Sequence, residues 1–101
     1  MIKVSTYSKD NVTYKVVIDG HSGYAENGYD IVCASVSSIV TTSVNILVRL
    51  DKDAISYEAK DGFIKMEISK HNEFIDIVLE NMIALLTELA SSYPKNIKIV
   101  K

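Results

Sequence analysis

The sequence of 101 residues contains one cysteine, one proline and no tryptophan. A single thiol, Cys33, cannot close a disulfide within the chain or build a zinc or iron–sulfur site from several cysteines. Neither sign of charge dominates, because 11 Lys and Arg oppose 13 Asp and Glu for a net charge of −2. We therefore expect a reducing compartment, and we do not expect nucleic acid as a direct ligand.

The sequence also lacks the pattern of a signal peptide. Residues 1–6 alternate apolar and polar side chains, with no long apolar run and no cleavage site of small residues. The longest uncharged stretch, Ile31 to Val48, has 18 residues, but seven of them are Ser, Thr or Asn. These patterns predict a cytoplasmic protein without a transmembrane helix.

What is present is typical of one globular domain over residues 1–101, with 48% hydrophobic and 24% charged residues. Residues 2–6 alternate, and residues 12–19 alternate again after a turn at 9–11, which predicts a hairpin. Residues 54–60 and 63–70 flank Asp61-Gly62, a favoured two-residue turn, which predicts a second hairpin. Residues 96–100 predict a last strand.

Two long helices are predicted between these strands. Asp30 has the chemistry of an N-cap, and a helix over 31–50 follows. Its apolar face is predicted at Val32, Val36, Ile39, Val40, Leu47 and Leu50. A second helix ends at Ser91-Ser92-Tyr93-Pro94, and its apolar stripe is predicted at Phe74, Val78, Met82, Leu85 and Leu89. The order β-β-α-β-β-α-β predicts an α+β two-layer sandwich, with both helices on an antiparallel or mixed sheet.

The segment that joins the first hairpin to the first helix, together with the start of that helix, contains the residues that could take part in catalysis. Gly20, Gly23 and Gly28 indicate a loop, His21 lies within it, and Cys33 falls in the first turn of the helix. Unpaired N–H groups and the helix dipole at this position favour the thiolate, and the same groups could bind an oxyanion. If the loop folds back, His21 and Cys33 form a dyad for nucleophilic catalysis.

Other interpretations of these residues remain open. Cys33 could be a small buried hydrophobic residue, and His21 an exposed loop residue. Asp30 could cap the helix, which is the commoner role, or orient the His21 imidazole. Ser37 lies one turn after Cys33 and could bind substrate or simply pack.

The sequence shows no pattern for a metal or nucleotide cofactor. The second histidine, His71, is predicted to be exposed at the start of the second helix. With one cysteine and two histidines, a metal site would need carboxylates at spacings that are not evident. The loop lacks the lysine of a phosphate-binding loop and the glycine spacing of a dinucleotide site. We expect no cofactor.

The loop and the start of the helix together form one sequence motif. It consists of Gly20-His21-Ser22-Gly23-Tyr24-Ala25, then Gly28, Asp30-Ile31-Val32-Cys33-Ala34 and Val36-Ser37. This pattern resembles the signature of the ribosomal-processing cysteine protease (Prp) family. Ser22 stands where alanine is more common, and Tyr29 where a charged residue is common. Neither departure touches the proposed dyad.

The resemblance implies a cytoplasmic endopeptidase that removes the N-terminal extension of a large-subunit ribosomal protein precursor. It implies Cys33 as nucleophile and His21 as base, with Asp30 and Ser37 at positions that the motif retains and Gly20 in a loop that moves to admit the substrate. It further implies a homodimer, and an apolar cleft under the loop of residues 20–29 that Tyr24 could line. No direct nucleic acid or membrane partner is expected.

Two functions of other classes fit the same residues. One is a ribosome-associated module that binds a peptide or dimerises without catalysis. The other is a thiol redox sensor, because an activated single cysteine is also oxidisable and could link two protomers.

Overall fold

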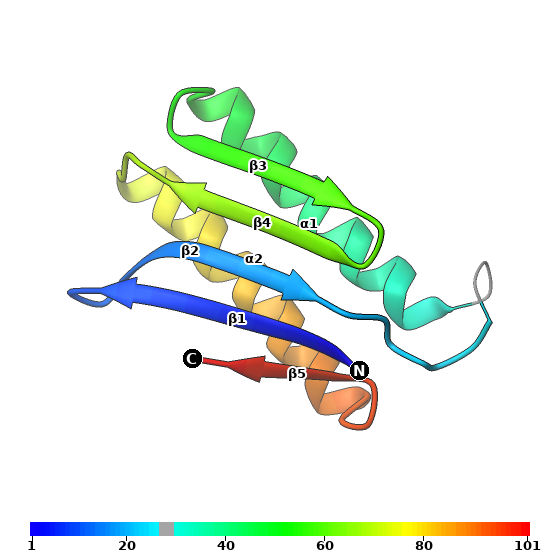
Figure 1. Cartoon of the computed structure of the whole chain (residues 1–101). Coiled ribbons are helices and arrows are strands. Elements are labelled where there is room, and N and C mark those ends of the chain that lie inside the picture. Colours follow the sequence, from blue (N-terminus) through cyan, green and yellow to red (C-terminus); the bar gives the residue numbers. More distant parts are fainter. Residues whose placement is uncertain (27–29) are drawn as a thin grey trace.

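The computed structural model describes residues 1–26 and 30–101 and shows two layers, with two helices covering one face of a five-stranded sheet (Figure 1). The elements are β1 (Ile2–Lys9), β2 (Val12–Asp19), α1 (Ile31–Leu50), β3 (Ile55–Lys60), β4 (Phe63–Ile68), α2 (Glu73–Ser92) and β5 (Ile97–Val100). The order across the sheet is β3-β4-β2-β1-β5. Strand β5 runs parallel to β1, and the other neighbours are antiparallel. The predicted α+β sandwich is confirmed, and its sheet is mixed.

Both predicted hairpins form, with small differences at their ends. Lys9 pairs with Val12 and so belongs to the strand, which leaves Asp10 and Asn11 in the turn with φ of 53° and 65°. Asp61 and Gly62 connect β3 to β4, and Gly62 has a φ of 70°, which glycine adopts at little cost. Strands β3 and β4 are shorter than predicted, since residues 54, 69 and 70 lie outside them.

Helix α1 has the predicted bounds and lies against the sheet through a valine-rich face. Its buried residues are Val32, Val36, Val40, Ser43, Val44 and Leu47. Leu50 was predicted on this face but is exposed, because it is the last residue of the helix and extends beyond the core. The helix is long and apolar enough to cross a membrane by those two criteria alone. That is weak evidence, because core helices of soluble proteins meet the same criteria, and here the helix packs into the core.

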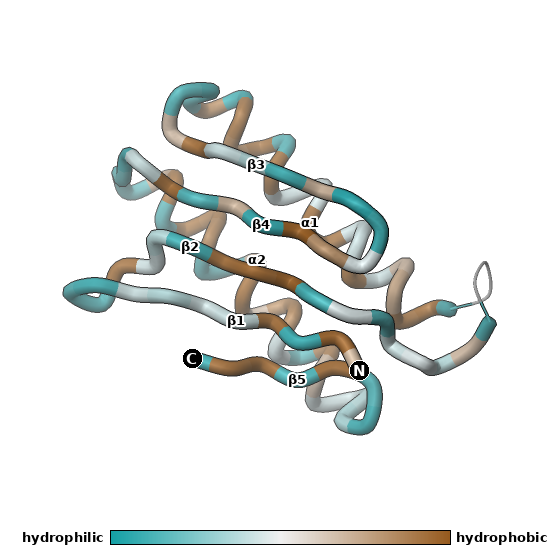
Figure 2. Tube along the Cα trace, viewed as in Figure 1, coloured by the Kyte–Doolittle hydropathy of each residue, from teal (hydrophilic) through white to brown (hydrophobic). Residues whose placement is uncertain are grey.

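The predicted apolar face of α2 is right at Met82 and otherwise wrong by one position or more. The residues that pack into the core are Ile75, Leu79, Met82 and Leu86. Phe74 is 66% exposed and Leu85 is 40% exposed, whereas Val78 and Leu89 are half-buried beside the core. Figure 2 shows hydrophobic and hydrophilic residues alternating along both helices. Because α2 has apolar residues on more than one side, periodicity alone could not select the side that faces the sheet.

Candidate active site

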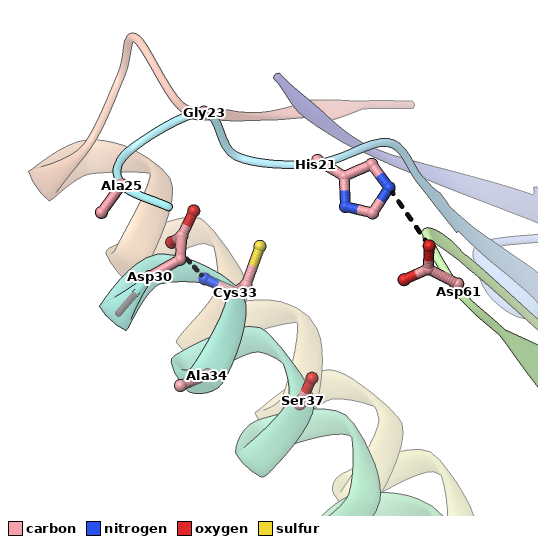
Figure 3. Close-up of a pocket in the computed structure, with 8 residues that line it drawn as sticks. All are labelled: His21, Gly23, Ala25, Asp30, Cys33, Ala34, Ser37 and Asp61. Atoms are coloured by element: carbon pink, nitrogen blue, oxygen red, sulfur yellow. Dashed lines mark hydrogen bonds and ion pairs between the residues drawn. The ribbon is translucent and has the colours of Figure 1, made fainter. Parts of the chain in front are cut away.

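The site is a cavity between the loop after β2, the first turns of α1 and the β3–β4 turn (Figure 3). Its volume is about 490 Å³. The described residues that line it are His21, Gly23, Ala25, Asp30, Cys33, Ala34, Ser37 and Asp61. The fold therefore brings His21 and Cys33 to one cavity, together with Ser37 and Asp30. Gly28 and Tyr29, which the sequence analysis included in the loop, lie outside the described residues.

The backbone before His21 is held between Met1 and the β3–β4 turn. Gly20 has a φ of 101°, and a β-carbon at this position would collide with the backbone carbonyl of Met1. The Gly20 N–H donates to the carbonyl of Gly62 at 2.9 Å. Only glycine combines this φ with such a close approach, so Gly20 sets where the His21 side chain starts.

Asp30 is the N-cap of α1, as predicted. Its Oδ1 accepts hydrogen bonds from the Val32 N–H at 3.0 Å and the Cys33 N–H at 2.9 Å, and its Oδ2 accepts one from the Ser22 hydroxyl. With both oxygens engaged in this way, the capping interpretation holds in place of the His21-orienting one. The N–H groups of Val32 and Cys33 are therefore not free for an oxyanion, contrary to the sequence-based expectation.

These contacts keep Asp30 ionised. Partial burial acts to raise the pKa of the Asp30 carboxyl, but hydrogen bonds from the Ser22 hydroxyl and the N–H groups of Cys33 and Ala25 outweigh it. The pKa falls from its ordinary value of 3.8 to about 2. The Cys33 side chain beside this carboxylate acts in the same direction. Because both Asp30 oxygens already accept hydrogen bonds, another group must accept the Cys33 proton.

The lowered pKa predicts a stability that depends on pH. Since the folded state binds the Asp30 proton less readily than the unfolded state, the carboxylate stabilises the fold above about pH 4, and this stabilisation is lost as pH falls toward 2. An Asp30→Ala variant should lose about 1 kcal/mol of unfolding free energy near neutral pH and progressively less on acidification. Urea denaturation across this range measures the difference.

The matched control is Asn72→Ala. Asn72 caps α2 with a neutral side chain, and its Oδ1 accepts from the Ile75 N–H at 3.0 Å. Its loss should cost a similar free energy with no dependence on pH over the same range. A difference between wild type and Asp30→Ala that stays constant down to pH 2 would contradict the assignment.

The first half of the loop is fastened to the end of α2 and the start of β5. Ser22 is buried, its carbonyl accepts from the Asn96 side chain at 3.0 Å, and its hydroxyl oxygen accepts from the Tyr24 N–H at 3.2 Å. Tyr24 packs edge-on against Tyr93, with ring centroids 5.5 Å apart. Tyr24 is not among the described residues that line the cavity. The structure therefore gives it a packing role, because the Tyr93 ring offers its side chain an apolar partner.

A second cavity, of about 290 Å³, shares His21, Cys33, Ser37 and Asp61 with the first. Its apolar lining comes from Ile2, Ile18, Val36, Phe63 and Ile64. Apolar space thus lies on the β2–β4 side of Cys33 in addition to the cavity beside the loop. This second cavity depends on the pairing of β2 with β4 at Ile18 and Ile64, a non-local contact that sequence patterns do not reveal.

Asp61 is a site residue that the sequence analysis did not identify. Its Oδ2 lies 3.8 Å from Nε2 of His21. The sequence indicated only a hairpin turn at Asp61-Gly62, forty positions from the histidine. No local signal could have linked the two, because their proximity depends on the pairing of β2 with β4.

The other histidine lies elsewhere. His71 is exposed, as predicted, and its Nδ1 lies 2.8 Å from Asp76 Oδ1. Across residues 1–26 and 30–101, no group of three or more His, Cys, Asp and Glu side chains is placed to hold a metal ion.

The family model described as cysteine protease Prp matches residues 1–98. The ribosomal processing cysteine protease Prp of Staphylococcus aureus strain Mu50 is 28% identical over 97 residues, which cover 93% of this chain and 92% of that protein.

Solved structures agree with the sequence match. The S. aureus protease Prp with a covalently linked product peptide superposes with a TM-score of 0.93 at 28% identity, covering 99% of this chain and 98% of that one. The same protease with a substrate peptide gives a TM-score of 0.85 at 27% identity, covering 98% and 97%. Because the family model spans nearly the whole sequence and the fold agrees throughout, this chain belongs to the cysteine protease Prp family.

Proposed function

We propose that this cysteine protease removes the N-terminal extension of a large-subunit ribosomal protein precursor, with Cys33 as nucleophile and His21 as general base. The observation that carries the proposal is the placement of both side chains on one cavity, with the family's motif around them. Within residues 1–26 and 30–101, no hydrogen bond joins the His21 ring to the Cys33 sulfur. Such contacts often tighten only when substrate binds.

The chemistry follows from the two side chains. His21 accepts the Cys33 thiol proton, and the thiolate attacks the carbonyl carbon of the scissile peptide bond. The C–N bond then breaks as the imidazolium returns the proton to the leaving amine, which leaves a thioester on Cys33. Water, deprotonated by His21, attacks the thioester and releases the carboxylate product and the thiol. The whole reaction uses two side chains and one water molecule.

The apolar cavity suits the side chain before the scissile bond. The resemblance to the family implies cleavage after aromatic or large apolar residues, and a volume of about 290 Å³ beside Cys33 accommodates one such side chain. Ile18, Val36 and Ile64 supply its apolar lining together with Phe63. We infer that this cavity, and not Tyr24, selects that residue.

The proposal includes a cytoplasmic homodimer. Exposed apolar side chains of α1 and α2 border a groove of about 340 Å³ that contains Ile46, Ile77 and Leu85. An apolar face on two adjacent helices is the kind of surface that a second copy covers. A sedimentation coefficient that remains that of one protomer at micromolar concentration would count against it.

The test is cleavage of a ribosomal precursor that carries its N-terminal extension, followed by intact-mass spectrometry. Wild-type protein should make one cut, and the product masses identify the bond. Because Cys33 is the only cysteine in the sequence, iodoacetamide labels the enzyme at one place, and the labelled enzyme should make no cut.

Two other results would overturn the proposal. A precursor that binds but stays intact would favour the non-catalytic peptide-binding module. Disulfide-linked protomers formed under mild peroxide, with no cleavage by the reduced protein, would favour the redox sensor.

A further inference from the structure

We propose that the β3–β4 turn is the third component of the site, beside His21 and Cys33. Asp61 is a positioning residue for the His21 imidazole, and Gly62, which has no side chain, leaves the space into which the ring fits. This inference rests on the proposed function, since it concerns the same two side chains. Neither residue belongs to the motif around Cys33. Both approach the site from a hairpin on the far side of β2.

The orientation of the ring is the first observation. Nε2 of His21 lies 3.8 Å from Oδ2 of Asp61. In Figure 3 the other ring nitrogen lies on the side of the ring toward Cys33. A carboxylate on one edge of the imidazole and a thiol on the other is the arrangement in which the first group orients the base for the second.

The fit of the ring against Gly62 is the second observation. A β-carbon built on Gly62 would lie 2.7 Å from Nε2 of His21 and 3.2 Å from its Cε1. The ring therefore occupies space that any other residue at this position would fill. Gly62 also accepts the hydrogen bond from the Gly20 N–H at 2.9 Å, so the turn holds the backbone beside His21 and leaves space for its ring.

The charges at the site give Asp61 a function in the reaction. Proton transfer from Cys33 to His21 makes an imidazolium, which a carboxylate beside the ring stabilises. Asp61 supplies a negative charge near the nitrogen that faces away from Cys33. At rest this contact is weak, because the His21 and Asp61 side chains are 66% and 98% exposed. A peptide that covers the cavity excludes water and strengthens it.

The experiment compares Asp61→Ala, Asp61→Asn and Asp61→Glu with wild type on a precursor peptide. We expect Asp61→Ala to lower kcat about tenfold and to change KM by less than about twofold, because positioning acts on the proton-transfer step. The kcat of Asp61→Asn should lie between those of Asp61→Ala and wild type, and Asp61→Glu should retain most of the wild-type kcat. The matched control is Asp10→Asn, which removes one exposed charge in the turn at the other end of β2 and should leave both constants unchanged.

A second readout does not depend on turnover. The rate at which iodoacetamide alkylates Cys33 at neutral pH reports the thiolate, and it should fall in Asp61→Ala but not in Asp10→Asn. If wild type fails to cut the precursor, the proposed function fails, while the alkylation rates still decide whether Asp61 acts on the pair. Equal kcat and alkylation rates in Asp61→Ala and Asp10→Asn, or a change confined to KM, would overturn the inference.

Discussion

Replacing Cys33 with alanine should reduce cleavage of the precursor by roughly 10⁴-fold or more, because the nucleophile of a covalent mechanism cannot be supplied by a neighbour. The chain contains no other thiol. The serine hydroxyl of Ser37 lines the same cavity one turn away, but a hydroxyl without a strong base is a poor nucleophile. The residual rate of Cys33→Ala is measured by using mass spectrometry to quantify the product during long incubations.

The folded state should tolerate this change. Cys33 is half-buried and lies at the edge of the core, so the loss of one sulfur atom leaves little empty space. Precursor peptide should therefore still bind to Cys33→Ala with near wild-type affinity, which a fluorescence titration checks. Cys33→Ser, which keeps the shape of the side chain, should be equally inactive. Residual cleavage within tenfold of wild type in both variants would place the nucleophile elsewhere.

Replacing His21 with alanine should lower kcat by roughly 10²- to 10⁴-fold, the range by which a positioned general base contributes. The effect should fall on kcat more than on KM, since the ring acts on protons of the reaction rather than on the bound peptide. The alkylation rate of Cys33 should fall in parallel, because the thiol then lacks the base that accepts its proton.

The structure offers both a control and a rescue for this variant. His71→Ala removes the other histidine of the sequence, which pairs with Asp76 at the start of α2, and should leave kcat unchanged. Because the His21 side chain is exposed and borders a cavity of about 490 Å³, free imidazole can enter the space left in His21→Ala. Partial recovery of kcat with added imidazole would identify the missing group as a base. Equal loss of activity in His71→Ala, with no imidazole recovery, would contradict the assignment.

Local features of the sequence determined the elements of this fold. The bounds of α1, the Asp30 cap and the Asp61-Gly62 turn follow from interactions between residues a few positions apart, and each prediction is confirmed. The motif around His21 and Cys33 was sufficient for the family, since both residues lie within one short segment. These features can be predicted without knowing the strand order, because their hydrogen bonds and φ angles depend on neighbouring residues.

The tertiary structure decided what depends on contacts between distant segments. It selected Ile75 and Leu79 over Phe74 as the core face of α2, because the sheet covers only one of several apolar sides. It packed Tyr24 against Tyr93, and Tyr24 is not among the described residues that line the cavity. It brought Asp61 beside His21 through the pairing of β2 with β4, which no spacing along the chain encodes. The sequence by itself thus determined the chemical groups and their local geometry. Their partners were decided by strand order and packing, because those interactions join residues that are neighbours only after the chain has folded.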